Sequence, residues 1–482
     1  MYSNSRALPP VGAAGRDIEM MRAMGDSASK SMTVGSYATG DRTYGAGLVH
    51  EQLDDFLLSL QEDQTQMKLM PLLYKQPCAG PVFKYDVITA WGTSSPYARA
   101  QGEIARPRPD SQVVEQTAAV LKRFGILGQV SFQAMMSDTI SDPETLEVRG
   151  QTMKLLKDIE ELLYTGDSTL NPLVFDGFRT MILKRSPSYN VIDCHGRPLT
   201  MDNVEDALAI LRDRPNLAQV NAIHLNVKDQ ARFNREYVLQ GRFDLTAPGV
   251  RGINTAFDRY KNIIADVEIE GTTFIQPGSR GLIPVGQQNA LAPAVPTVSA
   301  PQVAAAGAGQ RSNYQQSDEG SYYYFVQAEN QDGVSALVQV GSGAQNITAG
   351  EIVSFTITAG QGPRADLFRI FSTKKNETPV FGQGGVITDA NCWEIGAVPN
   401  VTTAMGAQPI PYLVTNDKMP GCNDGYVFDT RMETMFLITQ MALGKTDLAI
   451  FQTAKEFMLN TIICPALRAP SRVALFRNIG NA

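Results

Sequence analysis

The chain has 482 residues, of which 43% are hydrophobic and 19% charged, so it holds ample material for a buried core and is neither disordered nor collagen-like as a whole. Lysine and arginine number 42 against 49 aspartate and glutamate residues, which gives a formal net charge of −7. This sign disfavours a protein whose main affinity is for the phosphate backbone of nucleic acids.

The cysteines are odd in number, far apart in the sequence and without a CxxC pair: Cys78, Cys194, Cys392, Cys422 and Cys464. This pattern favours reduced thiols in a cytosol-like compartment over a disulfide framework. No run of about 18 apolar residues is present, and the start lacks the basic and then apolar regions of a signal peptide. We therefore expect a soluble protein that is not secreted and does not enter a membrane.

The N-terminal region predicts an arm. Residues 1–47 are rich in Gly, Ser, Ala and Met, with one short candidate helix at Asp17–Met24, and leucine and methionine recur at helical spacing from His50 to Met70. Two β-type runs then span Val82–Val130, on either side of a Pro/Arg-rich tip at Glu103–Asp110. They predict a long two-stranded excursion with too little apolar surface for a core of its own.

The clearest helix is expected at Ser141–Thr165. Ser141 and Glu144 have the spacing of a capping box, Pro143 suits an early helical position, and Gly166 is a stop signal. One face is expected to be apolar and to carry Leu146, Met153, Leu156, Ile159 and Leu163. At 1.5 Å per residue this helix would be roughly 36 Å long and would form a spine across a domain.

Mixed α and β structure is expected beyond the spine, to about Pro284. A helix at Asp202–Arg212 precedes a strand at Val220–Val227, in which Ile223 and Leu225 face one side and His224 the polar side.

An inserted β-sandwich is predicted next. Ala292–Gly309 has the Pro/Ala-rich composition of a linker, and short β-type runs separated by turns follow until about Thr402. The absence of a cysteine pair at immunoglobulin spacing favours the fibronectin-like variant. The mixed pattern returns from Tyr412, so the sandwich is interpreted as an insertion in a host domain.

Candidate chemical motifs fail on spacing. Gly444-Lys445-Thr446 resembles the end of a phosphate-binding loop, but Thr439 occupies the place of the required glycine. The adjacent Cys194 and His195 are interpreted as loop residues, because neighbours in sequence rarely converge on one substrate atom. Only His50 and His224 remain as further imidazoles for a metal site.

Paired carboxylates at Asp54/Asp55 and Glu160/Glu161 would diverge by about 100° along a helix, so they are expected to be solvated or interfacial. The glycosylation-like sequons at Asn346, Asn376 and Asn400 are interpreted as turn residues. We predict no catalytic, cofactor-binding or metal site and no enzyme activity.

Two blocks of sequence resemble one family. Glu160–Asp167, followed by Asn171–Phe178, resembles the end of the spine helix and the following turn in major capsid proteins of tailed bacteriophages, which have the Hong Kong ninety-seven-like fold. The C-terminal run from Phe457–Leu459 through Pro465–Pro470 and then Val473–Ile479 is similar to the closing strand and tail of that family. The order of arm, two-stranded loop, spine helix and mixed central domain is a third point of resemblance.

The resemblance implies an α+β fold with an N-terminal arm, an extended loop, a spine helix, and peripheral and axial domains, to which an all-β sandwich has been added. The expected boundaries are 1–70 for the N-terminal arm, 71–135 for the extended loop, 136–200 for the peripheral domain, 201–291 for the axial domain, 292–402 for the immunoglobulin-like insertion and 403–482 for the return.

The implied function is that of a major capsid protein that assembles into hexamers and pentamers of an icosahedral shell around the double-stranded DNA of a tailed bacteriophage. Implied partners are copies of the chain itself, scaffolding and portal proteins, and decoration proteins; DNA is enclosed without sequence-specific binding, and no cofactor or membrane is involved. Assembly would take place in the bacterial cytoplasm and the product would be the virion. The lysine and asparagine that crosslink subunits in some relatives have no match here.

Two other classes stay open. One is an adhesive or carbohydrate-binding protein that acts through the sandwich, and the other is an enzyme with an unrecognised site. Electron microscopy separates them, because only the capsid hypothesis predicts closed shells.

Overall fold

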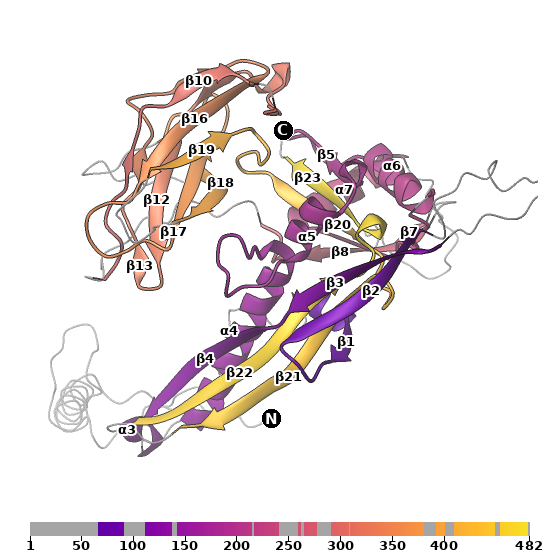
Figure 1. Ribbon diagram of the computed structural model, residues 1–482, viewed down its shortest axis with the longest axis vertical. Helices are drawn as coiled ribbons and strands as arrows, with labels where there is room; N and C mark the ends of the chain where they lie inside the picture. Colours follow the sequence, from indigo (N-terminus) through magenta and orange to yellow (C-terminus); the bar gives the residue numbers. More distant parts are fainter. Residues whose placement is uncertain are drawn as a thin grey trace, which may run out of the picture. The chain divides into compact units, whose positions relative to one another are not determined.

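The computed structural model describes residues 66–90, 111–136, 142–214, 216–240, 259–261, 265–276, 291–307, 309–379, 392–400, 409–448 and 454–480 (Figure 1). The candidate helix at Asp17–Met24, the tip at Glu103–Asp110 and most of the helical pattern from His50 to Met70 lie outside these residues. Of that last pattern only its end is described, where α2 (Leu69–Leu72) forms one short turn.

A four-stranded sheet has the order β1 (Tyr74–Pro77), β21 (Met435–Asp447), β22 (Ala454–Leu467) and β4 (Lys122–Ser131). β1 is parallel to β21 and the other pairs are antiparallel. The helix α4 (Pro143–Thr165) packs against β4 and β22 (Figure 1). Ile159 and Leu163 of α4 share a hydrophobic core with Phe436 and Phe457 of the sheet. A short helix, α3 (Phe132–Met136), follows β4.

The spine helix forms as expected, but its start and its apolar face differ. Asp142, not Ser141, is the N-cap, since its side chain accepts a hydrogen bond from the Thr145 N–H at 3.1 Å. The Glu144 carboxylate lies 2.7 Å from both Lys445 Nζ and Lys455 Nζ, so it pairs with β21 and β22 instead of completing a capping box. Leu146 is 44% exposed and is not part of the core that contains Ile159 and Leu163, so the expected apolar face does not reach the start of the helix.

The buried side chains of α4 gather in its second half and comprise Leu155, Ile159, Glu160, Leu163 and Tyr164. Glycine is required at position 166 for lack of space and not for its backbone conformation, because any residue can adopt its φ of −52°. A Cβ there would lie 2.6 Å from the Leu162 carbonyl oxygen and 2.7 Å from that of Phe175. The turn after the spine is therefore too tight for a larger side chain.

A six-stranded sheet has the order β5 (Val191–Asp193), β23 (Ala474–Ile479), β20 (Asn423–Phe428), β6 (Ala222–Asn226), β8 (Asp266–Thr272) and β7 (Arg259–Lys261). Helices α6 (Met201–Arg212) and α7 (Val227–Gln240) share its core, and α5 (Phe178–Arg185) contacts both β23 of this sheet and β22 of the four-stranded sheet. Short 3-10 turns lie at Ser188–Asn190, Gln316–Asp318 and Pro470–Arg472.

The apolar face expected for α6 is confirmed, since Val204, Leu208 and Leu211 are buried in one core with Ile223. The expectation that His224 lies on a polar side of its strand is wrong, because β6 lies inside the sheet and the side chain is 0% exposed. The range 201–291 is also too narrow for this unit: β5, β20 and β23 come from outside it.

Residues 297–414 contain two further antiparallel sheets. One joins β10 (Gln302–Ala305), β16 (Glu351–Thr358) and β19 (Ile410–Val414), with β9 (Thr297–Val298) also on β16. The other joins β13 (Gly333–Val334), β12 (Tyr324–Asn330), β17 (Leu367–Thr373) and β18 (Cys392–Pro399), with β14 (Val338–Gln339) on β12. A small pair joins β11 (Gly320–Tyr322) and β15 (Gln345–Ile347).

Both larger sheets contribute to one apolar core, with Val353 and Phe355 from one and Tyr324 and Phe368 from the other. Two expected boundaries are corrected by the strand pairing. The presumed linker at Ala292–Gly309 contains β9 and β10, and the unit continues past Thr402 because β19 pairs with β16 from Ile410 to Val414. Strands this short carry little apolar periodicity of their own, so their positions become clear only from the strands with which they pair.

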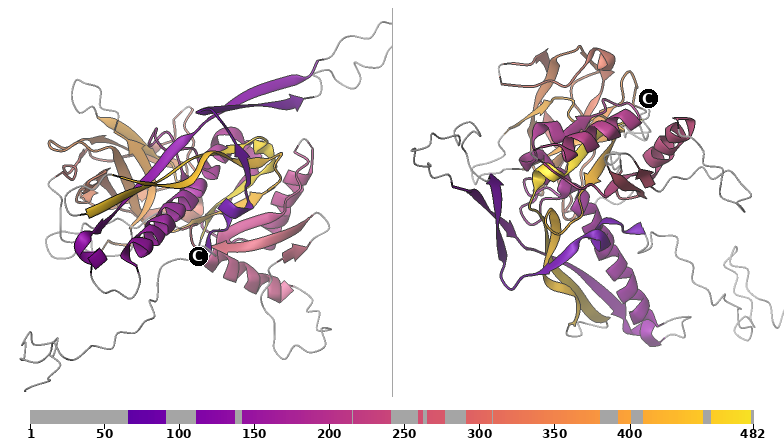
Figure 2. Two further views of the ribbon diagram at one scale, coloured as in Figure 1. Left: turned by 90° about the horizontal axis from the view of Figure 1, so that it is seen from below. Right: turned by 90° about the vertical axis from the view of Figure 1, so that its right-hand side faces the viewer.

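The remaining strands, β2 (Val82–Ala90) and β3 (Val113–Val120), form a separate antiparallel pair (Figure 2). The second β-type run of the sequence divides at Leu121, whose N–H donates to the Pro81 carbonyl at 2.9 Å. Its later part is β4 and belongs to the four-stranded sheet, so the two-stranded excursion ends near Val120 instead of Val130.

All five cysteines are unpaired. In the part of the chain that the structure describes, no helix is both long and apolar enough to span a membrane.

Candidate functional site

The β2–β3 ribbon is fixed at its base through Tyr85. The hydroxyl of this buried side chain donates to the Leu467 carbonyl at 3.2 Å and accepts from Arg185 Nη1 at 3.3 Å. Its ring meets Phe436 edge-on, with centroids 5.8 Å apart, and the Arg468 guanidinium lies 6.0 Å from its centroid. The ribbon therefore leaves the sheet from a fixed point.

The face of the ribbon opposite the Tyr85 side chain is largely exposed. Strand pairing places Val82 opposite Val120 and Ile88 opposite Val114, and these side chains are 42%, 49%, 45% and 55% exposed. Because side chains alternate along a strand, the four lie on one face, away from Tyr85. Between them Gln116 donates to Asp86 at 2.9 Å. We call this face, with its two apolar pairs, the outer arm face.

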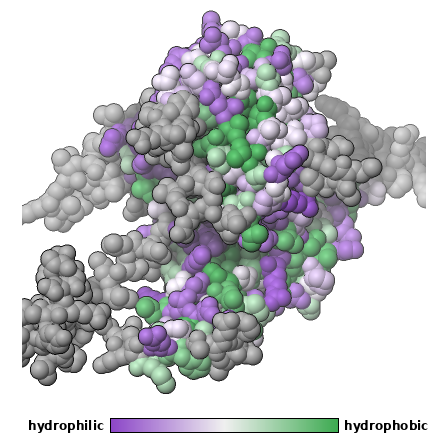
Figure 3. Space-filling view, turned by 90° about the vertical axis from the view of Figure 1, so that its left-hand side faces the viewer, coloured by the Kyte–Doolittle hydropathy of each residue, from purple (hydrophilic) through white to green (hydrophobic). Residues whose placement is uncertain are grey.

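Other exposed apolar residues are scattered. Leu127, Leu173 and Leu217 are 54%, 69% and 57% exposed, and one face of the molecule shows hydrophobic patches among hydrophilic residues (Figure 3). Single exposed leucines are ordinary in proteins, whereas paired apolar residues along a ribbon suggest an interaction surface.

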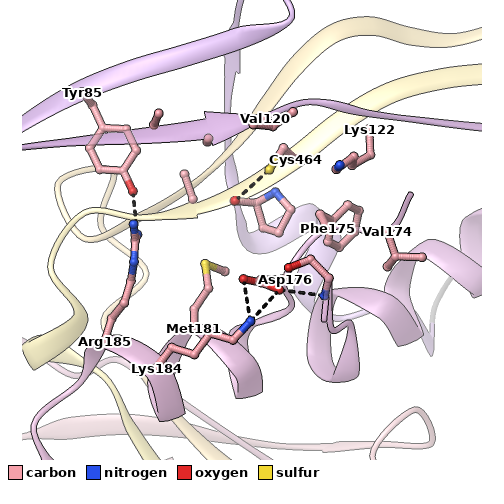
Figure 4. Close-up of a pocket in the computed structure, with 15 residues that line it drawn as sticks. Tyr85, Val120, Lys122, Val174, Phe175, Asp176, Met181, Lys184, Arg185 and Cys464 are labelled. Carbon is pink, nitrogen blue, oxygen red and sulfur yellow. Dashed lines mark hydrogen bonds and ion pairs between the residues drawn. The ribbon is translucent and has the colours of Figure 1, made fainter. Parts of the chain in front are cut away.

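An open cavity of about 250 Å³ lies beside the base of the ribbon (Figure 4). Its charged groups already have partners: Lys184 Nζ lies 3.2 Å from Asp176, Lys122 Nζ donates to the Pro172 carbonyl at 2.6 Å, and Arg185 reaches Tyr85. Burial raises the pKa of the Cys464 thiol to about 12, so this lining cysteine stays protonated at neutral pH. The cavity is smaller than typical ligand sites, and its polar groups hold the fold together.

Glu160 is the most deeply buried carboxylate of the spine helix, with no exposed surface. Its Oε1 accepts from the backbone N–H groups of Lys68 and Leu69 at 3.0 and 2.6 Å, and its Oε2 from that of Met70 at 2.9 Å. Burial raises the pKa of this carboxyl, while the three hydrogen bonds act in the opposite direction. The expectation that Glu160 is solvated or interfacial is therefore wrong, since the carboxylate is buried against backbone of its own chain; Glu161, its neighbour, is exposed.

Tyr164, one turn after Glu160, pairs with His224 of β6. Tyr164 Oη lies 2.7 Å from His224 Nδ1, and both side chains are completely buried. Burial lowers the pKa of His224 to about 3, so the imidazole is neutral at physiological pH. The pair links the spine helix to the six-stranded sheet.

Those candidate motifs that the structure describes do not come together in a reactive site. Cys194 is buried and its pKa is raised to about 12 by burial, while His195 Nε2 lies 3.0 Å from Gln315 Nε2. Lys445, of the failed phosphate-loop pattern, lies in β21 and pairs with Glu144. His50 and the Asp54/Asp55 pair lie outside the described residues.

The three sequon asparagines differ: Asn346 lies in strand β15, opposite Ser321, so the expectation of a turn is wrong at that position. Asn376 has a φ of 57° and accepts from the Ser321 N–H at 3.0 Å, as a turn residue does. Asn400 is buried and donates to the Ala365 carbonyl at 2.8 Å. Within the described ranges, no group of three or more His, Cys, Asp or Glu side chains is arranged to hold a metal ion.

No family model and no curated protein matches the sequence. Among solved structures, the capsid of a native GTA particle is 10% identical with a TM-score of 0.47, and the match covers 92% of this chain and 98% of that one. Mycobacterium phage Bobi is 7% identical with a TM-score of 0.42, covering 90% and 96%. The holo-SrpI encapsulin complex from Synechococcus elongatus PCC 7942 is 7% identical with a TM-score of 0.41, covering 90% and 94%. Likenesses of this degree assign no family.

Proposed function

We propose that the chain is a shell-forming structural protein, the major capsid protein of a tailed bacteriophage, which assembles into hexamers and pentamers around double-stranded DNA. The observation that carries the proposal is the outer arm face. Its two apolar pairs, Val82/Val120 and Ile88/Val114, are exposed on a ribbon whose base is fixed by Tyr85.

A second copy of the chain is the natural cover for this face. Burial of apolar surface stabilises association by roughly 25 cal/mol per Å², and a shell repeats each contact many times. A ribbon fixed at its base presents the four side chains in one orientation, which lowers the entropy cost of docking. Extended arms on a rigid body are what a subunit needs to contact several neighbours.

The charge and the sequence resemblance support the same function. The net charge of −7 suits an inner surface that does not adhere to packaged DNA. The blocks Glu160–Asp167 and Pro465–Pro470, which resemble tailed-phage capsid proteins, lie at the end of α4 and across the end of β22. Scaffolding, portal and decoration proteins are proposed as partners on the same grounds, and no catalytic role is proposed.

Sedimentation of an arm variant tests the proposal. Val114→Asp places a charge on the outer arm face and should leave the subunit folded while it reduces particle formation at least about tenfold, since an unpaired charge in an apolar contact costs several kcal/mol. Leu217→Asp is the control, because Leu217 is similarly exposed but belongs to the loop after α6 and to neither strand of the ribbon. Particles from the Val114 variant in normal yield would contradict the assignment of this face.

A further inference from the structure

We infer that Glu160 is a positioning residue that fixes the path of the backbone at residues 68–70, through which the N-terminal segment is connected to β1. Both of its carboxylate oxygens are used by three consecutive backbone N–H groups, those of Lys68, Leu69 and Met70, which precede it by about ninety residues in sequence. The role in assembly rests on the proposed function, in which the N-terminal segment acts as an arm; the contact itself does not.

The Glu160 carboxyl group and the three backbone N–H groups each need the other as a hydrogen-bond partner. A carboxyl group without exposed surface is costly unless hydrogen bonds replace the lost water, and here three backbone N–H groups replace it. Conversely, the first N–H groups of α2 have no partner within so short a helix. Removal of the carboxylate therefore leaves buried backbone donors unsatisfied, at about 1–3 kcal/mol per group.

Apolar contacts also hold residues 67–70 but do not set the direction of the backbone there. Met67 and Leu69 are buried in the core that contains Ile159 and Leu163. Hydrophobic burial is non-directional, whereas hydrogen bonds to three successive N–H groups fix the path of the backbone. The nearby ion pair between Lys68 and Glu270, 3.9 Å long and partly exposed, adds little.

Glu160→Gln is the decisive variant. An amide keeps the size of the side chain but offers one oxygen and one NH2 group, so at least one of the three N–H groups faces a donor. Glu161→Gln is the matched control, since it makes the same change at the next, exposed residue. Glu160→Asp, which keeps the charge and withdraws it by one methylene, should give an intermediate result.

The measurement is amide hydrogen exchange in the full chain, followed by electron microscopy of particles. In the Glu160→Gln variant, exchange at residues 68–70 should be at least about tenfold faster, with β21 and β22 unchanged, and particles should be fewer or misshapen. The Glu161→Gln variant should match the unaltered protein in both respects.

Three results would overturn the inference. Amides 68–70 of the unaltered protein could exchange as fast as those of an unstructured peptide, or Glu160→Gln could leave their exchange unchanged. Loss of protection throughout β21 and β22 in that variant would show a general structural role instead of a positioning one. If the unaltered chain formed no shells, the proposed function would fail, while the exchange data would still decide whether Glu160 holds the segment.

Discussion

Tyr164 and His224 form a buried pair between α4 and β6, and the imidazole is kept neutral by its surroundings. A base whose pKa is lowered on folding binds fewer protons in the folded state than in the unfolded state. Its contribution to stability is complete above the unfolded pKa of 6.5 and is lost as pH falls toward the folded value of about 3.

We predict that the free energy of unfolding falls by about 2 kcal/mol between pH 6.5 and pH 5 on account of His224. His224→Asn keeps a polar atom near Tyr164 Oη but does not titrate, so its loss of stability over this interval should be smaller by about that amount. Urea unfolding of both proteins at pH 7 and pH 5 measures the difference. His195→Asn is the control, and equal pH dependence of the His224 variant and the unaltered protein would contradict the account.

The sequence predicted the burial of some side chains on the spine helix correctly and that of others wrongly. Ile159 and Leu163 were placed correctly in the core by their spacing. Glu160 was missed because nothing local distinguishes it from Glu161; its partners are N–H groups at Lys68 and Met70, which carry no side-chain signal. A buried carboxylate satisfied by distant backbone is visible only once the fold is known.

The two halves of the spine helix α4 are held by different interactions. Its second half lies in the core, whereas its first half is fixed by Asp142 and by the ion pairs of Glu144 with Lys445 and Lys455. These surface charges hold the helix end in place but contribute modestly to stability.

We therefore predict that Ile159→Ala lowers the free energy of unfolding by about 2–5 kcal/mol, because it opens a cavity at a site with no exposed surface. Leu146→Ala, on the same helix but 44% exposed, should cost less than about 1 kcal/mol. Denaturant titration measures both. Similar losses for the two variants would show that the apolar face extends over the first half, as the sequence pattern alone suggested.

Residues 297–414, whose two sheets share one core and which we call the sandwich-like unit, offer a test at the level of strand pairing. A fragment from Leu291 to Asp417 contains β19 and should unfold cooperatively on its own. A fragment that ends at Thr402 lacks the strand that pairs with β16 over five residues, so it should be unfolded or prone to aggregation. Circular dichroism and thermal melts of the two fragments decide between them, and a stable shorter fragment would restore the boundary expected from composition.

The extent of the long helix α4 was predicted to within two residues because its signal lies within one continuous run of sequence. The sheets were not predicted, because their neighbours are distant in sequence. β4 pairs with β22 although more than three hundred residues separate them, and β5 pairs with β23 across a separation nearly as long. Hydrophobic periodicity says which face of a strand is buried but not which strand lies beside it.

At the scale of the whole molecule, the sheet that supports the ribbon is built from both ends of the described chain. β1 and β4 come from before the spine helix, and β21 and β22 come from after the sandwich-like unit. This arrangement leaves residues 297–414 as a unit with its own core, which a shell subunit could carry without disturbing the sheets.

The central claim is that this chain builds closed shells. Electron microscopy of the full-length protein, co-produced with its proposed scaffolding and portal partners, tests it most directly. The account predicts closed particles of uniform size with hexameric and pentameric units in the unaltered protein and in the Leu217→Asp control, and few or none with Val114→Asp. Monomers or small rings alone from the unaltered, soluble chain would contradict it.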